Sequence, residues 1–234
     1  MKKYIELSNV YKTYTNGKVK KQALKKINLI INKGEIIIIF GPSGSGKTTL
    51  LNCISGLDSP TKGRIKINKD FISRYNEKEL TKFRRKNLGF IFQTYNLLEN
   101  LNVKQNIQVG ASLSKKKVNI DKILDIVGLT EHKTKYMFEL SGGEQQRVSI
   151  GRALAKSPEI MFCDEPTGAL DEETGKKVLE ALVNINEELG TTLIIVTHNP
   201  GIATIGDRII KMNSGSIVED VKNKRVKPKN ILWG

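Results

Sequence analysis

A glycine-rich run is the part of the sequence best suited to hold phosphate groups. It fits the pattern G-x-x-x-x-G-K-[ST] and reads Gly41-Pro42-Ser43-Gly44-Ser45-Gly46-Lys47-Thr48, followed by Thr49. In this pattern the glycines let successive backbone N–H groups converge on phosphate oxygens. The amino group of Lys47 can reach the β- and γ-phosphates, and the hydroxyl of Thr48 can ligate Mg²⁺. The run therefore predicts a binding site for ATP together with Mg²⁺.

Two adjacent carboxylates could complete such a site. Asp164 and Glu165 directly follow the apolar residues 160–163. A carboxylate at the end of a buried strand can hold a metal ion directly or through water, which assigns Asp164 to Mg²⁺. The next side chain points in another direction, so Glu165 can orient or deprotonate the attacking water. An acidic pair is weak evidence alone, but it becomes strong evidence beside a phosphate-binding loop.

Hydrophobic patterning predicts the elements that must position these residues. The continuous apolar run Ile36–Phe40 is typical of a parallel strand buried on both faces. After the glycine-rich run, residues 50–57 carry leucine and isoleucine at helical spacing. Further along, buried strands are predicted at 160–163 and 193–196, with an amphipathic helix at 178–189 between them. The glycine-rich run therefore lies between a strand and a helix, which is the context that its pattern requires.

The middle of the chain has a different pattern. Residues 120–127 place apolar side chains at i, i+3, i+4 and i+7, and Gly128 is a plausible helix stop. We therefore expect a helical subdomain at about 95–150, inserted into an α/β core. The predicted fold class is α/β, with a mostly parallel core sheet and an antiparallel β subdomain. One domain is expected over 1–221, followed by a basic tail over 222–234.

Composition narrows the class of protein. The 234 residues carry a formal charge of +15, but the lysines are scattered, so the charge is weak evidence for nucleic-acid binding. No stretch reaches the roughly 18 apolar residues that a membrane-spanning helix needs, and the N-terminus lacks the apolar region of a secretory signal. Cys53 and Cys163 lie in apolar segments without metal-ligand spacing, which predicts buried, inert thiols. A cytoplasmic protein is expected.

One hexapeptide resembles the signature of a known family. The signature LSGGQ of ABC transporter nucleotide-binding domains is matched, except for Glu in the fifth position, by Leu140-Ser141-Gly142-Gly143-Glu144-Gln145. The resemblance covers nearly all of residues 1–220 and implies a P-loop NTPase fold of the ABC type. The Glu variant is similar to the branch that contains macrolide exporters, lipoprotein-release systems and antimicrobial-peptide-resistance systems. Ser141 and Glu144 also have capping-box spacing, which places Ser141 at a helix N-terminus that can hold an anion.

The resemblance implies roles for four more residues. Tyr14 resembles the aromatic residue that stacks on adenine, although Tyr11 is a rival. Gln93 resembles the Q-loop glutamine that touches Mg²⁺, and His198 resembles the switch histidine that contacts the γ-phosphate. Asp171 resembles the D-loop aspartate, and it could also cap the next helix. The catalytic set implied by the resemblance is Glu165, His198, Lys47 and Gln93.

The family resemblance also implies partners. The signature residues 141–144 would contact the nucleotide held by a second copy of the chain, so a homodimer is expected around two ATP molecules. An integral-membrane permease is the expected partner at the inner face of the cell membrane, and nucleic acid is not expected. Two alternatives stay open: a complex that transmits force without transport, and a soluble ABC ATPase that acts on nucleic acid or ribosomes. The basic tail, 222–234, could touch anionic lipid, but a solvated, disordered terminus is the preferred interpretation.

Overall fold

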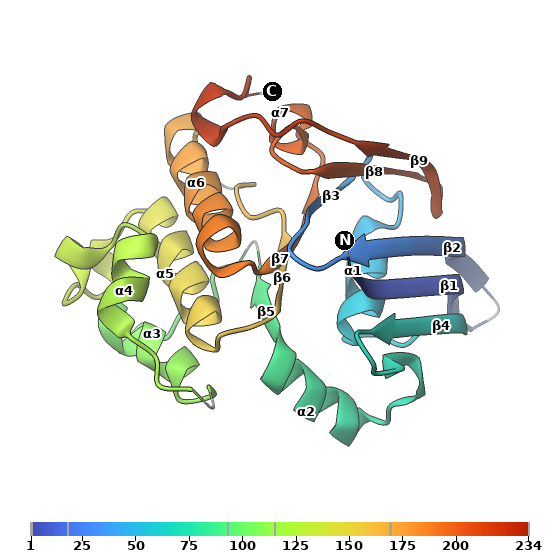
Figure 1. Ribbon diagram of the computed structural model, residues 1–234, viewed down its shortest axis with the longest axis horizontal. Coiled ribbons are helices and arrows are strands. Elements are labelled where there is room, and N and C mark those ends of the chain that lie inside the picture. The colour runs from blue at the N-terminus through green and yellow to red at the C-terminus, as the bar shows by residue number, and fades with distance from the viewer. Residues whose placement is uncertain (1, 18, 93, 115, 169, 234) are drawn as a thin grey trace.

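A six-stranded sheet with the order β5-β6-β7-β3-β8-β9 forms the core of the molecule (Figure 1). The computed structural model describes residues 2–17, 19–92, 94–114, 116–168 and 170–233. Neighbouring strands are parallel except for the last pair, β8 and β9, which is antiparallel. The six strands are β3 (Ile36–Phe40), β5 (Leu88–Ile91), β6 (Ile160–Asp164), β7 (Thr192–Thr197), β8 (Arg208–Asn213) and β9 (Ser216–Lys222). The prediction of a mostly parallel core sheet is therefore confirmed.

The central strand β3 is buried on both faces, as its continuous apolar run predicted. Ile36 and Ile38 belong to one hydrophobic cluster, which includes side chains of the helices that follow residue 100. Ile37 and Ile39 belong to a second cluster, which includes side chains of the phosphate-loop helix. All four isoleucines have 0% of their surface exposed. This burial holds the end of β3 rigidly where the glycine-rich run begins.

A second, three-stranded antiparallel sheet covers one side of the core and has the order β2-β1-β4. Its strands are β1 (Lys3–Asn16), β2 (Val19–Asn32) and β4 (Lys62–Ile67). Ile5 of β1 lies opposite both Ile31 of β2 and Ile67 of β4, and all three side chains are buried. The period-2 pattern of apolar residues therefore forms the inner face of this sheet.

Helices cover the remaining faces. They are α1 (Lys47–Ser55), α2 (Glu77–Asn87), α3 (Val103–Ala111), α4 (Ile120–Ile126), α5 (Gly142–Ala155), α6 (Glu172–Leu189) and α7 (Pro200–Ala203). Figure 1 shows α3, α4 and α5 gathered on the side of the molecule away from the antiparallel sheet, and their residues fall largely within the range of about 95–150 given for the predicted helical subdomain. Among the described residues, no helix has both the length and the apolar character that membrane crossing requires.

Helix α6 begins at Glu172, before the first apolar residue of its predicted pattern at 178, and Asp171 caps it as predicted: its side chain accepts a hydrogen bond from the backbone N–H of Thr174 (3.0 Å). The end of another helix differs from the sequence prediction. Helix α1 ends at Ser55 because Gly56 adopts a left-handed conformation. Leu57 was expected on the apolar face of this helix, but it lies beyond the helix end and is 44% exposed.

The residues after β9 are packed against the domain. The segment 223–233 contains a short 3₁₀ helix at Pro228–Asn230, in which Pro228 is buried. The next residue, Ile231, is only 3% exposed and belongs to the same hydrophobic cluster as Val178 of α6. The preferred interpretation of this tail as a disordered terminus is therefore wrong for residues 223–233. Its apolar residues find a surface on α6 that the sequence pattern of the tail did not reveal.

Candidate functional site

The predicted site residues meet at one edge of the core sheet. Phe40 of β3 pairs with Thr197 of β7, and Asp164 of β6 pairs with Val196 of the same strand. The strands are parallel, so their carboxyl ends lie at the same edge. The glycine-rich run follows Phe40, Glu165 follows Asp164, and His198 follows Thr197. Chain segments more than 30 residues apart in sequence are thus brought together by strand pairing.

The glycine-rich run forms a loop that leads into α1. Gly46 is the N-cap of the helix and has a φ of 101°, a conformation that favours glycine, and a Cβ there would lie 2.7 Å from the backbone oxygen of Ala23. The side chain of Lys47 is nearly buried, and its amino group donates hydrogen bonds to the carbonyl oxygens of Gly41 (2.8 Å) and Pro42 (3.0 Å). The lysine charge is therefore held over the loop, where the positive end of the helix also lies.

The loop fits a phosphate group. The hydroxyl of Ser45 is buried and has no hydrogen-bond partner among the described residues. An unpaired buried hydroxyl is costly, so a site with phosphate oxygens as acceptors would satisfy it. Nearby, the Thr48 hydroxyl lies 3.4 Å from Asp164 Oδ1, and oxygen ligands of these two kinds suit Mg²⁺.

The carboxyl groups beside the loop favour a cation. Burial raises the pKa of Asp164 above its ordinary value, and the neighbouring Glu165 carboxylate acts in the same direction. The cause is that a buried negative charge beside another negative charge is unfavourable. A divalent cation at this point would relieve the repulsion. The electrostatics of the pair thus agree with the metal role that the sequence predicted for Asp164.

Glu165 and His198 contact each other. The distance between Glu165 Oε1 and His198 Nδ1 is 2.8 Å, and the glutamate side chain is 21% exposed while the histidine is 69% exposed. Glu165 has a φ of 48°, an uncommon left-handed conformation for a non-glycine residue, and its N–H donates to the carbonyl of Val196 (3.0 Å). Strained backbone of this kind is maintained where the side chain must point in a fixed direction.

These residues surround a cavity of about 850 Å³. Of the predicted residues, the ones that line it are Tyr14, Ser43, Gly44, Gly46, Lys47, Thr48, Thr49, Glu165 and His198. The structure describes other predicted residues that are not among the lining residues: Gly41, Ser45, Asp164, Asp171 and the signature residues 141–144. Other lining residues were not indicated by the sequence pattern: Lys21, Gln22, Ala23 and Lys25 of β2, and Ser214 and Gly215. The dipeptide Ser214-Gly215 is typical of a turn, but nothing in it indicates that the turn borders the cavity.

The structure distinguishes the two tyrosines. Tyr14 lines the cavity, and its hydroxyl donates a hydrogen bond to Asp58 (2.8 Å), which also accepts one from the amino group of Lys12. Burial opposes the charge on Asp58, but the hydrogen bonds from Lys12 and Tyr14 outweigh it and lower the pKa of this carboxyl. Tyr11 is not among the lining residues. Asp58, which the sequence analysis missed, therefore fixes the ring of Tyr14 beside the cavity.

The signature segment and the start of α6 pack closely together. Ser141 caps α5, and its backbone N–H and hydroxyl donate to one carboxylate oxygen of Glu144, at 2.7 and 2.8 Å. A Cβ at Gly143 would lie 1.8 Å from Cγ2 of Thr174, so only glycine allows this approach of α5 to α6. The predicted capping box is confirmed. This close packing explains why position 143 is glycine, which an ordinary capped helix would not require.

Comparison with known proteins gives the family. The family model described as ABC transporter matches residues 24–168, which include the glycine-rich loop, the signature and the carboxylate pair. This chain belongs to the ABC transporter family. A putative ABC transporter ATP-binding protein of Mycoplasma pneumoniae is 49% identical over 216 residues, which are 91% of this chain and 46% of that protein. The cassette thus spans about half the length of the first Mycoplasma relatives that it matches.

Other relatives agree with this assignment. The bacitracin export ATP-binding protein BceA of Halalkalibacterium halodurans is 44% identical over 218 residues, which are 91% of this chain and 86% of that protein. Among solved structures, a dimeric ATP-binding cassette bound to ADP and phosphate superposes with a TM-score of 0.83 at 38% identity, covering 95% of this chain and 100% of that one. The predicted fold of the ABC type is therefore confirmed. Gln93 lies outside the described residues, so its Q-loop role stays a prediction.

Proposed function

We propose that this cassette binds ATP with Mg²⁺, pairs with a second copy across two nucleotides, and hydrolyses them to drive a separate membrane permease. The observation that carries the proposal is the convergence of Lys47, Thr48, Asp164, Glu165 and His198 at one edge of the core sheet. Cavities that combine a cationic loop with a carboxylate pair are suited to phosphoryl transfer rather than to simple binding.

Each residue has a chemical task in this proposal. The oxygens of Thr48 and Asp164 would hold Mg²⁺, which supplies positive charge next to the phosphate oxygens when it is bound. Lys47 and His198 stabilise the negative charge that develops on the γ-phosphoryl oxygens during hydrolysis. Glu165 aligns the attacking water and accepts its proton. The contact between Glu165 and His198 supports this assignment, because it holds the carboxylate toward the cavity that both residues line.

The positions of the signature residues support a dimer. Residues 141–144 do not line the cavity of their own chain, although Ser141 is exposed at a helix N-terminus that can hold an anion. A two-fold dimer would place this surface of each copy over the nucleotide of the other, because each chain offers both surfaces. The related cassette bound to ADP and phosphate is a dimer, which agrees with this arrangement.

An exposed aromatic pair supports a docking surface for the permease. Tyr136 and Phe138 stack on each other with ring centroids 5.9 Å apart, and their exposed fractions are 42% and 83%. Phe92 is also 38% exposed, one residue before Gln93. Exposed aromatic residues of this size are typical of protein contact surfaces. The relative named for bacitracin export supports an exporter, or a system that handles antimicrobial peptides or lipoproteins, at the inner face of the membrane.

The decisive experiment is the Glu165→Gln variant. We expect phosphate release to fall by roughly 10²- to 10⁴-fold, the usual contribution of a general base. We also expect a stable dimer with ATP on size-exclusion chromatography, while Lys47→Ala should neither bind ATP nor dimerise. Glu173→Gln is the matched control, since this glutamate is 81% exposed and forms a surface ion pair with Lys177. Near-normal turnover of Glu165→Gln would refute the assigned mechanism.

The partner can be tested with the same variant. Tagged Glu165→Gln, purified from its own cells in the presence of ATP, should retain an integral-membrane protein. Mass spectrometry then identifies that protein, and its extracellular part indicates the cargo. Recovery of ribosomes or DNA-bound proteins without a membrane protein would contradict the transport function but leave the ATPase chemistry intact.

A further inference from the structure

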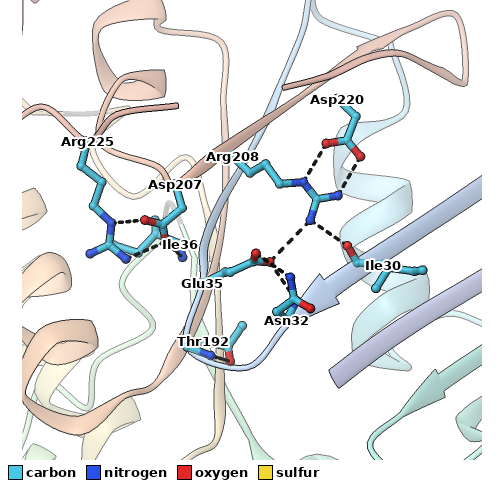
Figure 2. A network of polar contacts seen from close by, with 10 residues as sticks. Ile30, Asn32, Glu35, Ile36, Thr192, Asp207, Arg208, Asp220 and Arg225 are labelled. Carbon is cyan, nitrogen blue, oxygen red and sulfur yellow. Dashed lines mark hydrogen bonds and ion pairs between the residues drawn. The ribbon is translucent and has the colours of Figure 1, made fainter. Parts of the chain in front are cut away.

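The 223–233 segment is tied to the core at its beginning. The side chain of Asn223 donates to the carbonyl oxygens of Thr204 and Gly206, both at 2.8 Å. Arg225 forms a two-pronged ion pair with Asp207, and the same carboxylate accepts a hydrogen bond from the backbone N–H of Ile36 at 2.8 Å (Figure 2). Because Ile36 begins β3, the segment is anchored to the strand that leads into the phosphate loop.

The end of the segment touches two elements that adjoin the site. A Cβ at Gly175 would lie 2.1 Å from Cη2 of Trp233, so the indole ring rests directly on the first turns of α6. A Cβ at Gly201 would lie 1.8 Å from the carbonyl oxygen of Leu232, so the backbone of the segment rests on α7. Ile231, between these contacts and the 3₁₀ helix, is 3% exposed and anchors them.

The turn of α6 under Trp233 is the one that meets the signature. Asp171 caps this turn, and its backbone carbonyl accepts a hydrogen bond from the N–H of Gly175 (2.8 Å). Thr174, next to Gly175, is the residue that packs against Gly143 of the signature. This turn of α6 therefore contacts Trp233 on one side and the signature on another.

The short helix α7 begins directly after the switch histidine. Asn199, which follows His198, caps α7 by accepting hydrogen bonds from the N–H groups of Gly201 (2.8 Å) and Ile202 (3.2 Å). Its backbone N–H also donates to the hydroxyl of Thr197 (3.1 Å). A displacement of α7 would thus be passed to His198 through one capping residue.

We propose that Trp233 is a positioning residue for hydrolysis, acting through the first turns of α6 and, with the Leu232 backbone, through α7. The contacts of Trp233 and Leu232 hold Asp171, the signature and His198 in fixed positions relative to one another. They thereby position both surfaces that meet in the dimer. This inference rests on the proposed function, because it assigns a role in ATP hydrolysis. The phosphate loop and Tyr14 lie outside these contacts, so we expect the contacts to affect kcat far more than the nucleotide affinity of the single chain.

The test combines kinetics with hydrogen exchange. For Trp233→Ala we expect kcat to fall by about 10- to 100-fold, the cost of a small misplacement of reacting groups, with KM for ATP unchanged. Backbone amides of residues 174–175 and 201–202 should exchange faster in the nucleotide-free protein, while those of α1 stay protected. Trp233→Phe should restore most of the activity. Lys224→Ala is the matched control, because this exposed lysine lies in the same segment and should change neither measurement.

A second variant keeps the proposal falsifiable if Trp233→Ala is poorly folded. Gly175→Ala places a methyl group where the indole ring rests, so it should lower kcat to a similar extent, and the double variant should be no worse than Trp233→Ala alone. Additive losses, an unchanged kcat in folded Trp233→Ala, or unchanged exchange at 174–175 would each overturn the positioning role. Absence of hydrolysis in the unaltered protein would instead contradict the proposed function. Hydrogen exchange at residues 174–175 would still test the contact with Trp233.

Discussion

Replacing Asp207 with alanine should destabilise the cassette far more than replacing its ion-pair partner, Arg225. Figure 2 shows why the two changes differ. Asp207 accepts two hydrogen bonds from the guanidinium group of Arg225, at 2.5 and 2.6 Å, and a third from the backbone N–H of Ile36 at 2.8 Å. Removing the arginine breaks this ion pair and a longer one with the exposed Glu187 (4.0 Å), whereas removing the aspartate leaves the buried N–H of Ile36 without its acceptor.

The expected magnitudes follow from burial. The side chains of Arg225 and Asp207 are 27% and 34% exposed, so solvent screens their ion pair, and we assign it about 1 kcal/mol. Ile36 is 0% exposed, and a buried N–H that loses its partner costs about 2 kcal/mol. We therefore expect a loss of about 3 kcal/mol in the free energy of unfolding for Asp207→Ala and about 1 kcal/mol for Arg225→Ala.

Urea unfolding followed by circular dichroism would measure both effects. With a slope of about 3 kcal/mol per molar urea, Asp207→Ala should lower the midpoint by about 1 M and Arg225→Ala by about 0.3 M. Asp207→Asn is the matched control, since its amide oxygen can still accept from Ile36, and it should resemble Arg225→Ala. Equal losses for Asp207→Ala and Arg225→Ala would show that the backbone hydrogen bond contributes little, and would refute the reasoning.

Two further substitutions and one labelling experiment have defined outcomes. Tyr14→Ala should raise KM for ATP by about 5- to 10-fold without lowering kcat, because a stacked aromatic pair contributes about 1–1.5 kcal/mol; an unchanged KM in steady-state kinetics would argue against adenine stacking. Asp164→Asn should abolish Mg²⁺-dependent hydrolysis yet raise the melting temperature of the nucleotide-free protein at neutral pH. Burial raises the pKa of Asp164 in the folded state, so its ionisation destabilises the fold above that pKa, and the gain should disappear as pH falls below the ordinary pKa of aspartate. Cys53 and Cys163 are 1% and 0% exposed, and burial raises the pKa of both thiols, to about 12 for Cys53. An aromatic disulfide reagent should therefore label neither thiol until the protein is unfolded. Rapid labelling of the folded protein would contradict their burial.

Much of the fold could be predicted because its signals are local. The apolar run of β3 and the glycines before Lys47 determine a strand and a loop from adjacent residues alone. The capping box of Ser141 and Glu144 is likewise set by spacing of three residues. Where local signals were misread, a single residue decided the outcome: Gly56 ended α1 before Leu57 could join its apolar face.

Other parts of the site could not be predicted because they depend on contacts between distant segments. Asp58 holds Tyr14 across 44 residues of sequence, and neither residue carries a local sign of the other. The turn at Gly215 enters the site because its N–H donates to the carbonyl of Ser45, at 3.0 Å, which only the pairing of β8 with β3 allows.

The sequence by itself determined the family, the phosphate-binding loop and the identity of the carboxylate pair, since each is written in consecutive residues whose chemistry is direct. Tertiary structure alone decided that Tyr14 rather than Tyr11 borders the cavity, and that residues 223–233 are packed rather than free. The physical reason is that packing and ion pairing depend on which surfaces the folded sheet brings together. Trp233 gains a place on Gly175 only because α6 presents a bare backbone there.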